Sequence, residues 1–166
     1  MGPGRSDPQG PHSYKHDRIS ALAVLTVSPI RRHIGLYARF QQEYLKAVHV
    51  APFLRQLLRH MPGPVILLWD QGKVHKGPAI ARVLLDNPRL QTEFFPKYAP
   101  ELNPTEQVWN DYKGHTANSR INGPPGLPLD KQDIRNSLHA NKRRLRRSQD
   151  KLRSLILASK VPSPFG

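Results

Sequence analysis

The sequence predicts a mixed α/β fold, and two patterns carry that prediction. Residues 19–40 contain two β-rich runs joined by a short link that includes Pro29, which indicates an antiparallel hairpin. Residues 65–95 have the pattern of a strand, a helix and a second strand, which is typical of two parallel strands joined by a crossover helix. A hairpin followed by such a unit predicts a mixed sheet with helices packed against it.

The hairpin strands are expected at residues 19–27 and 33–40. Residues 44–50 are ambiguous between helix and loop. Pro52 suits the first position of a helix whose apolar face holds Phe53, Leu54, Leu57 and Leu58. The remaining elements follow from the same kind of pattern: a strand at 65–70, helices at 77–86 and 104–116, a strand at 90–95, a Pro/Gly break at 123–128, and one long helix or two shorter ones over 130–158.

The composition points to a polyanionic partner. The chain has 166 residues, with 26 Lys and Arg against 12 Asp and Glu, and a formal charge of +14. Such an excess favours nucleic acid, because cationic side chains neutralise phosphates and release counterions. The chain has no cysteine, which excludes disulfides and thiolate metal sites. No apolar stretch approaches the ~20 residues of a membrane span, so we expect no membrane partner and a cytoplasmic protein.

The expected C-terminal helices are densely basic. Two interpretations stay open for this charge: a surface that contacts DNA phosphates, which we favour, or a solvated helix face. The residues concerned are Lys142, Arg143, Arg144, Arg146 and Arg147.

Two carboxylates are expected at the ends of elements. Asp70 follows the apolar strand, and Glu106 lies in the first turn of a helix that Asn103 and Pro104 begin. Mg²⁺ prefers such oxygen ligands, and metal-bridged carboxylates suit phosphodiester chemistry. The structural alternatives are that Asp70 caps a turn and that Glu106 caps its helix. His75 could hold a phosphate or pack at the start of the next helix.

Two motifs connect these residues. The first is Leu67-Leu68-Trp69-Asp70 followed by His75. The second is Phe95-Pro96-x-Tyr98-x-Pro100-Glu101-Leu102-Asn103-Pro104-x-Glu106-x-x-Trp109-x-x-x-Lys113. Together they resemble the DDE-type transposases of the mariner-like superfamily, especially its bacterial insertion-sequence branch. The 35 residues between Asp70 and Glu106 fit that family's usual separation of its second and third acids.

This resemblance implies a ribonuclease-H-like fold that binds Mg²⁺ or Mn²⁺ and cuts and rejoins DNA. Asp70 and Glu106 would be the second and third catalytic acids and metal ligands, and Trp109 would pack beneath them. His75 and Lys113 are further candidates for DNA contact. The DNA partners would be transposon ends and target, which implies association with the nucleoid.

The family's first acid lies on a strand upstream of the segment that matches residues 19–27. Neither Asp7 nor Asp17 lies inside a comparable strand. We therefore expect the C-terminal part of a transposase: a flexible arm at 1–17, a partial catalytic domain at 18–120 that lacks its first strand, and a basic helical region at 121–166. A second copy of the chain or an upstream-encoded fragment would complete it. The alternative function is a non-catalytic, basic nucleic-acid-binding remnant of a degraded element.

Overall fold

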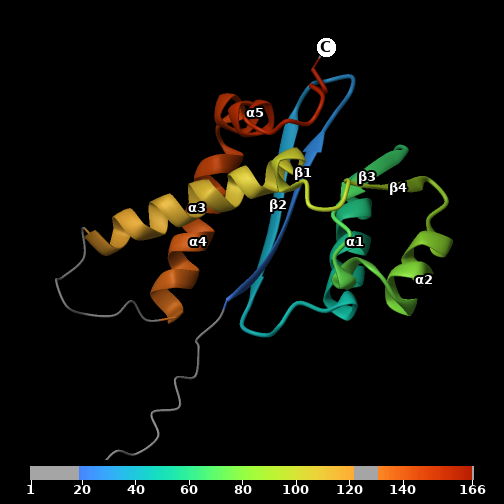
Figure 1. The fold of residues 1–166 in the computed structure, drawn as a ribbon, viewed down its shortest axis with the longest axis horizontal. Coiled ribbons are helices and arrows are strands. Elements are labelled where there is room, and N and C mark those ends of the chain that lie inside the picture. Colours follow the sequence, from blue (N-terminus) through green and yellow to red (C-terminus); the bar gives the residue numbers. More distant parts are fainter. Residues whose placement is uncertain (1–18, 122–130, 166) are drawn as a thin grey trace, which may run out of the picture.

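A computed structural model describes residues 19–121 and 131–165. The expected N-terminal arm and the Pro/Gly break at 123–128 lie outside the described residues. The elements, in chain order, are β1 (Ser20–Val27), β2 (Ile34–Gln41), α1 (Ala47–Arg59), β3 (Val65–Trp69), α2 (Pro78–Asp86), β4 (Leu90–Phe94), α3 (Pro104–Ile121), α4 (Lys131–Arg146) and α5 (Gln149–Leu157), with short 3₁₀ turns at Lys73–His75 and Pro100–Leu102 (Figure 1).

The predicted hairpin is confirmed. β1 and β2 pair antiparallel over their whole length, from Ser20 opposite Gln41 to Val27 opposite Ile34. Gly35 lies opposite Thr26, where an added Cβ would approach Thr26 Oγ1 to 2.5 Å. A larger side chain at this position would therefore push the two strands apart.

The strand–helix–strand unit is also confirmed. β3 and β4 pair in parallel, with Val65 opposite Leu90 and Trp69 opposite Phe94, and α2 connects them. The mixed α/β architecture is thus as predicted, but the four strands form two separate two-stranded sheets. Leu22 of β1 and Leu67 of β3 share one apolar cluster, yet no backbone pairing joins these strands in the described residues.

The predicted start of α1 at Pro52 is wrong. The helix begins at Ala47 and Pro52 lies inside it. The N–H of Lys46 donates to Nδ1 of His49 at 3.2 Å, so a histidine takes the place that Glu or Gln usually has in a capping box. Pro52 removes one N–H from the helix, and because it lies on the exposed side, water can reach the freed carbonyl.

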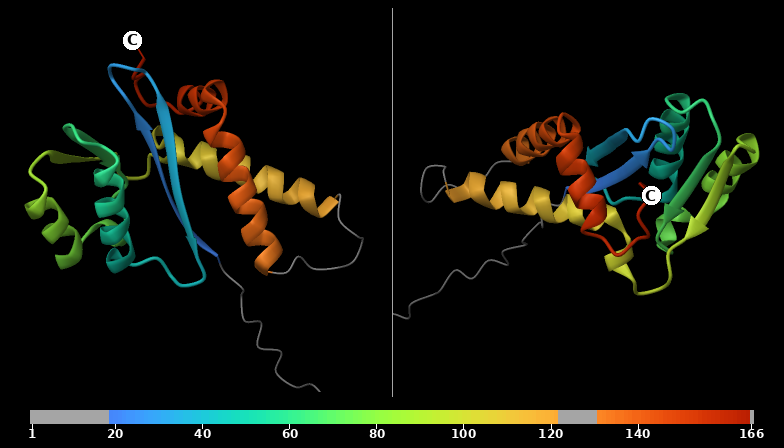
Figure 2. Two further views of the ribbon diagram at one scale, coloured as in Figure 1. Left: turned by 180° about the vertical axis from the view of Figure 1, so that it is seen from behind. Right: turned by 90° about the horizontal axis from the view of Figure 1, so that it is seen from above.

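Two apolar clusters lie on the two faces of the hairpin. Alternate residues of β1 divide between them, as expected for a strand buried on both sides. The first cluster is formed mainly by α1, α2 and β3, with Leu54, Leu57, Trp69 and Val83 at its centre. The second is formed with α3, α4 and α5 and includes Leu36, Val108, Leu145 and Leu152. Figure 2 shows the hairpin between these two groups of helices.

The C-terminal region forms two helices, one of the two alternatives left open by the sequence. Ser148 separates them, since its Oγ accepts a hydrogen bond from the N–H of Lys151 at 3.2 Å as the N-cap of α5. Gln149 reaches the outer edge of β2. Its side-chain amide both accepts from the N–H and donates to the C=O of Ile34, each at 2.9 Å.

Candidate functional site

Asp70 follows the last residue of β3, as predicted, and its side chain is 59 % exposed. Its Oδ1 accepts a hydrogen bond from the N–H of Gly72 at 2.7 Å and lies 3.2 Å from Nε2 of His75. A Cβ on Gly72 would come within 2.7 Å of the same oxygen, so a larger residue there would displace the Asp70 carboxylate from this position. Asp70 therefore caps a turn, while Oδ2 makes no hydrogen bond or ion pair with the described residues.

His75 lies between Trp69 and Asp70. Its side chain is only 12 % exposed, and its ring lies 4.8 Å from that of Trp69, tilted by 30°. Burial lowers the pKa of His75, and the nearby Asp70 carboxylate opposes that shift. The other ring nitrogen, Nδ1, is buried and has no hydrogen-bond partner in the described part of the chain. The DNA contact predicted for His75 stays a prediction.

Glu106 occupies the first turn of α3, as predicted. Asn103 precedes the helix and accepts hydrogen bonds through Oδ1 from the N–H and the hydroxyl of Thr105, at 3.1 Å and 2.7 Å. Asn103 thus caps α3 without help from Glu106. The half-buried Glu106 carboxylate makes no hydrogen bond or ion pair with any residue of 19–121 or 131–165.

Main-chain hydrogen bonds fix the segment between the two acids. The N–H of Phe95 donates to the C=O of Trp69 at 2.9 Å, and Gln71 Nε2 donates to the C=O of Phe95 at 3.2 Å. Further along, the N–H of Lys160 donates to the C=O of Glu101 at 2.8 Å. The loop from β4 to α3 is therefore attached both to β3 and to the segment after α5. Trp109 contacts Tyr112 edge to face and packs against the second apolar cluster.

The donor set fits a hard cation in part. Asp70 Oδ2 and the carboxylate of Glu106 are oxygen donors without hydrogen-bond or ion-pair partners among the described residues, and Mg²⁺ is commonly held by one or two carboxylates and several waters. No three His, Cys, Asp or Glu side chains of the described residues lie close enough together to hold a metal ion. These residues therefore supply two possible ligands and no third.

The basic residues singled out in the sequence separate on three surfaces. Lys113 is exposed on α3, Arg143 is exposed on α4, and Arg147 is exposed directly after the end of α4. Arg144 instead pairs with Asp111 of α3, whose side chain is 8 % exposed. Lys142 and Arg146 face an open groove between α1, β2 and α4. Their contact with DNA stays a prediction.

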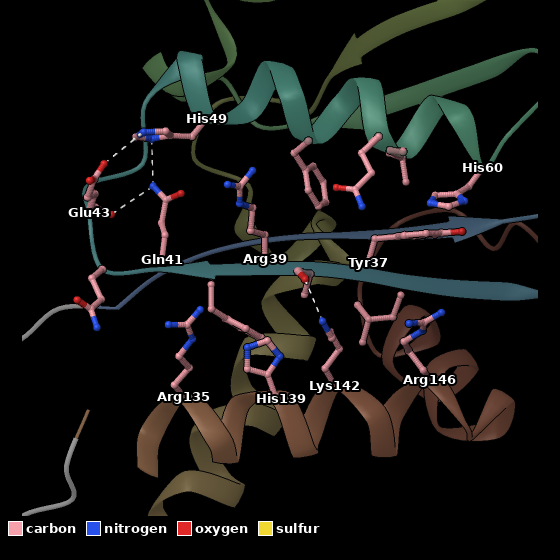
Figure 3. A pocket seen from close by; sticks show the side chains of 17 residues that line it. Tyr37, Arg39, Gln41, Glu43, His49, His60, Arg135, His139, Lys142 and Arg146 are labelled. Atoms are coloured by element: carbon pink, nitrogen blue, oxygen red, sulfur yellow. Dashed lines mark hydrogen bonds and ion pairs between the residues drawn. The ribbon is translucent and has the colours of Figure 1, made fainter. Parts of the chain in front are cut away.

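This groove, of about 980 Å³, was not predicted from the sequence. Figure 3 shows α1 on one side of β2 and α4 on the other, with side chains of all three elements directed into the space between them. Further basic residues that line it are Arg39 of β2, His49 of α1, His60 at the C-cap of α1, and Arg135 and His139 of α4. A regular spacing on α4 was the only local signal, because the other members come from positions about a hundred residues away.

None of the helices within the described ranges has an apolar stretch long enough to cross a membrane.

Comparisons with known proteins agree with the fold. A family model described as DDE superfamily endonuclease matches residues 2–123. The catalytic domain of Mos1 mariner transposase superposes with a TM-score of 0.50 at 13 % identity, over 91 % of this chain and 87 % of that chain. The structure of a simian T-cell lymphotropic virus intasome in complex with PP2A regulatory subunit B56 gamma contains a chain that matches with a TM-score of 0.53 at 12 % identity.

That intasome match covers 86 % of this chain and 55 % of the other, so this chain spans about half of its length. At such identities the likeness concerns the fold, and it confirms the predicted ribonuclease-H-like architecture. A search of curated proteins finds no match. The bacterial insertion-sequence branch stays a prediction.

Proposed function

Because the chain belongs to the DDE superfamily of endonucleases, we propose that it is part of a transposase and contributes two acids to metal-dependent cleavage and joining of DNA. The observation that carries the proposal is the state of these acids. Asp70 is fixed by Gly72 and His75 with one oxygen unused, and Glu106 begins α3 with no protein partner in the described residues.

In this proposal the two carboxylates hold Mg²⁺ or Mn²⁺. When bound, the cation would supply stabilisation of charge on the attacking and leaving oxygens of the phosphodiester. Asp70 and Glu106 provide hard oxygen ligands from rigid positions, a strand end and a helix start. His75 keeps the Asp70 carboxylate in one orientation, and Trp69 keeps the ring of His75 in place.

We further propose that a strand from a partner completes the site, either from a second copy of the chain or from an upstream-encoded fragment. β1 and β3 each pair on one side only in the described structure. On β3, Ile66 and Leu68 are 67 % and 50 % exposed, although both are apolar strand residues. A strand between β1 and β3 would pair with both edges and could carry the third acid that the resemblance implies.

A plasmid-nicking assay with Mg²⁺ or Mn²⁺ tests the two acids. Nicking should disappear in Asp70→Asn and in Glu106→Gln, since each change removes a charged oxygen ligand and keeps the shape of the side chain. Glu101→Gln is the matched control, because Glu101 is an exposed acid in the loop that leads from β4 to α3. Nicking that persists in Asp70→Asn would contradict the proposed role of the acids.

The same assay tests the partner strand. The isolated chain should nick weakly, and adding the polypeptide encoded immediately upstream should raise the rate. Robust nicking by the isolated chain, abolished by Asp70→Asn, would support the chemistry and rule out the need for a partner.

A second candidate function is a non-catalytic nucleic-acid-binding module. It is favoured by the charge of +14 and by the finding that no three metal-binding side chains gather in the described residues. This module would bind DNA with an affinity that falls steeply with salt, and Asp70→Asn and Glu106→Gln would leave its properties unchanged.

A further inference from the structure

We propose that the groove between α1, β2 and α4 binds a single-stranded nucleic acid along the outer edge of β2. Neither Asp70 nor Glu106 lines this groove. The inference therefore concerns a second site, separate from the candidate acids, and it does not depend on metal.

The groove carries an uncompensated positive charge. Arg39, Arg135 and Arg146 line it and make no hydrogen bond or ion pair within the described structure. Its one carboxylate, Glu43, lies at the rim, 3.6 Å from His49. An anion is the ligand that such a set of unpaired cations favours.

The excess of positive charge also lowers the pKa values of two groups on α4, His139 and Lys142. The pKa of His139 is lowered, first by desolvation and then by Lys142, Arg135 and Arg143. The pKa of Lys142 is lowered by desolvation and then by Arg146 and Arg143. A bound anion would relieve this repulsion between cations.

Basic side chains of α4 form a row. Arg135, His139, Lys142 and Arg146 follow one another at steps of four, three and four residues, which places them on one helix face. At 1.5 Å per residue the row is about 16 Å long, close to the length of five stacked nucleotides at about 3.4 Å each. Lys142 also donates from Nζ to the C=O of Ala38 at 3.3 Å, which holds the row against β2.

The opposite wall offers aromatic surface. The rings of Tyr37 and His60 are stacked, with centroids 5.9 Å apart and planes 24° apart, and both side chains line the groove (Figure 3). Phe53 also lines the groove and is buried. Cations along one side and aromatic rings along the other are the combination that single-strand binding proteins use for backbone and bases.

This combination favours a single strand over two other occupants. A duplex keeps its bases stacked inside and could not place them against Tyr37 and His60. A second copy of the chain would bring two basic grooves together, and their like charges would repel. Both alternatives are outcomes of the following test.

The probe is a fluorescent oligothymidylate of about 15 nucleotides, whose binding is followed by anisotropy in the presence of EDTA. The test variant is Arg135→Gln with Arg146→Gln, which removes two charges from the groove. The matched control is Arg55→Gln with Arg59→Gln, which removes two charges from exposed positions of α1 outside the groove lining. Circular dichroism checks that each variant is folded.

The groove variant should bind the probe about tenfold or more weakly and should flatten the slope of log affinity against log salt by about 1.4, which is 0.7 per lost contact. The control should change affinity by less than about threefold. Tyr37→Leu should weaken binding of the single strand about fivefold or more through lost base stacking, and should leave a duplex of the same sequence unaffected.

Equal losses in the groove variant and the control would overturn the proposal, as would equal affinity for the duplex and the single strand. Sedimentation that shows a dimer disrupted by the groove variant would assign the groove to a second copy instead. Because the assay contains EDTA, binding of the probe is measured independently of metal-dependent cleavage, and a failure of the proposed cleavage leaves this result unaffected.

Discussion

At the scale of single residues, His75 connects the apolar core to Asp70. One face of its ring is against Trp69, and Nε2 lies 3.2 Å from Asp70 Oδ1. The other nitrogen is buried without a partner in the described residues, which costs free energy. The ring therefore packs against the core and orients Asp70. The buried, unpaired nitrogen lowers the stability of the fold.

Replacing His75 separates these two contributions. His75→Phe keeps the aromatic packing and removes the unpaired nitrogen, so the free energy of unfolding should change by less than about 1 kcal/mol. His75→Ala leaves a cavity beside Trp69 and should cost about 2 kcal/mol or more. Urea denaturation followed by tryptophan fluorescence measures both. Equal destabilisation by the two variants would show that the polar contact, and not the ring, stabilises the fold.

At the scale of elements, Asp111 attaches α3 to the two C-terminal helices. Its carboxylate pairs with Arg144 of α4 and lies 3.4 Å from Lys151 Nζ of α5, while its side chain is only 8 % exposed. Arg144, one of the arginines predicted to bind DNA, is thus held in an ion pair within the protein. Sequence patterns could not indicate this pairing, because 33 residues separate the partners.

We expect Asp111→Asn to lower the free energy of unfolding by about 2 kcal/mol, because it leaves two partly buried cations without their anion. Asp86→Asn is the control, since it breaks the exposed pair of Asp86 with Arg82 within α2 and should cost less than about 0.5 kcal/mol. Chemical denaturation measures both variants. A loss in Asp111→Asn no larger than in the control would refute the structural role.

The same scale explains which elements were predictable. The hairpin and the parallel strands were predicted because the pattern of apolar residues along a strand depends on which of its faces are buried. The Pro and Gly residues in the connecting turns marked where the strands end. The start of α1 was missed because His49 is an unusual residue for the third helical position. The division of α4 from α5 was left open, since the apolar stripe continues through it and only the cap at Ser148 marks the end.

The candidate site was predictable to a similar extent. The positions of Asp70 at a strand end and Glu106 in a first helical turn follow from local pattern, and the structure places both there. The contact of His75 with Asp70 spans five residues of irregular turn, whose path no periodicity describes. The basic groove depends on tertiary packing, which brings Arg39 and His60 opposite α4.

At the scale of the whole molecule, the net positive charge lowers the stability of the fold. A formal charge of +14 on 166 residues produces self-repulsion in the compact state. The two apolar clusters on either side of the hairpin must overcome this repulsion. Polyanionic ligands relieve it, which is consistent with the proposed partners.

Added salt should therefore stabilise the protein. Raising NaCl from about 0.02 M to about 0.3 M shortens the Debye length several-fold and should raise Tm by about 3 °C or more. Differential scanning calorimetry measures the change, and the test variant Arg135→Gln with Arg146→Gln should show a smaller rise. A fall in Tm with salt would mean that the ion pairs around Asp111 outweigh the general repulsion.

The side chain of Gln149 has a further consequence for the sheet. By occupying the N–H and C=O of Ile34, it imitates the hydrogen bonds of a neighbouring strand at the outer edge of β2. Open edges of this kind recruit other strands and lead to aggregates. Because one amide from α5 occupies the edge at the first residue of β2, another strand could not pair with Ile34 without displacing Gln149.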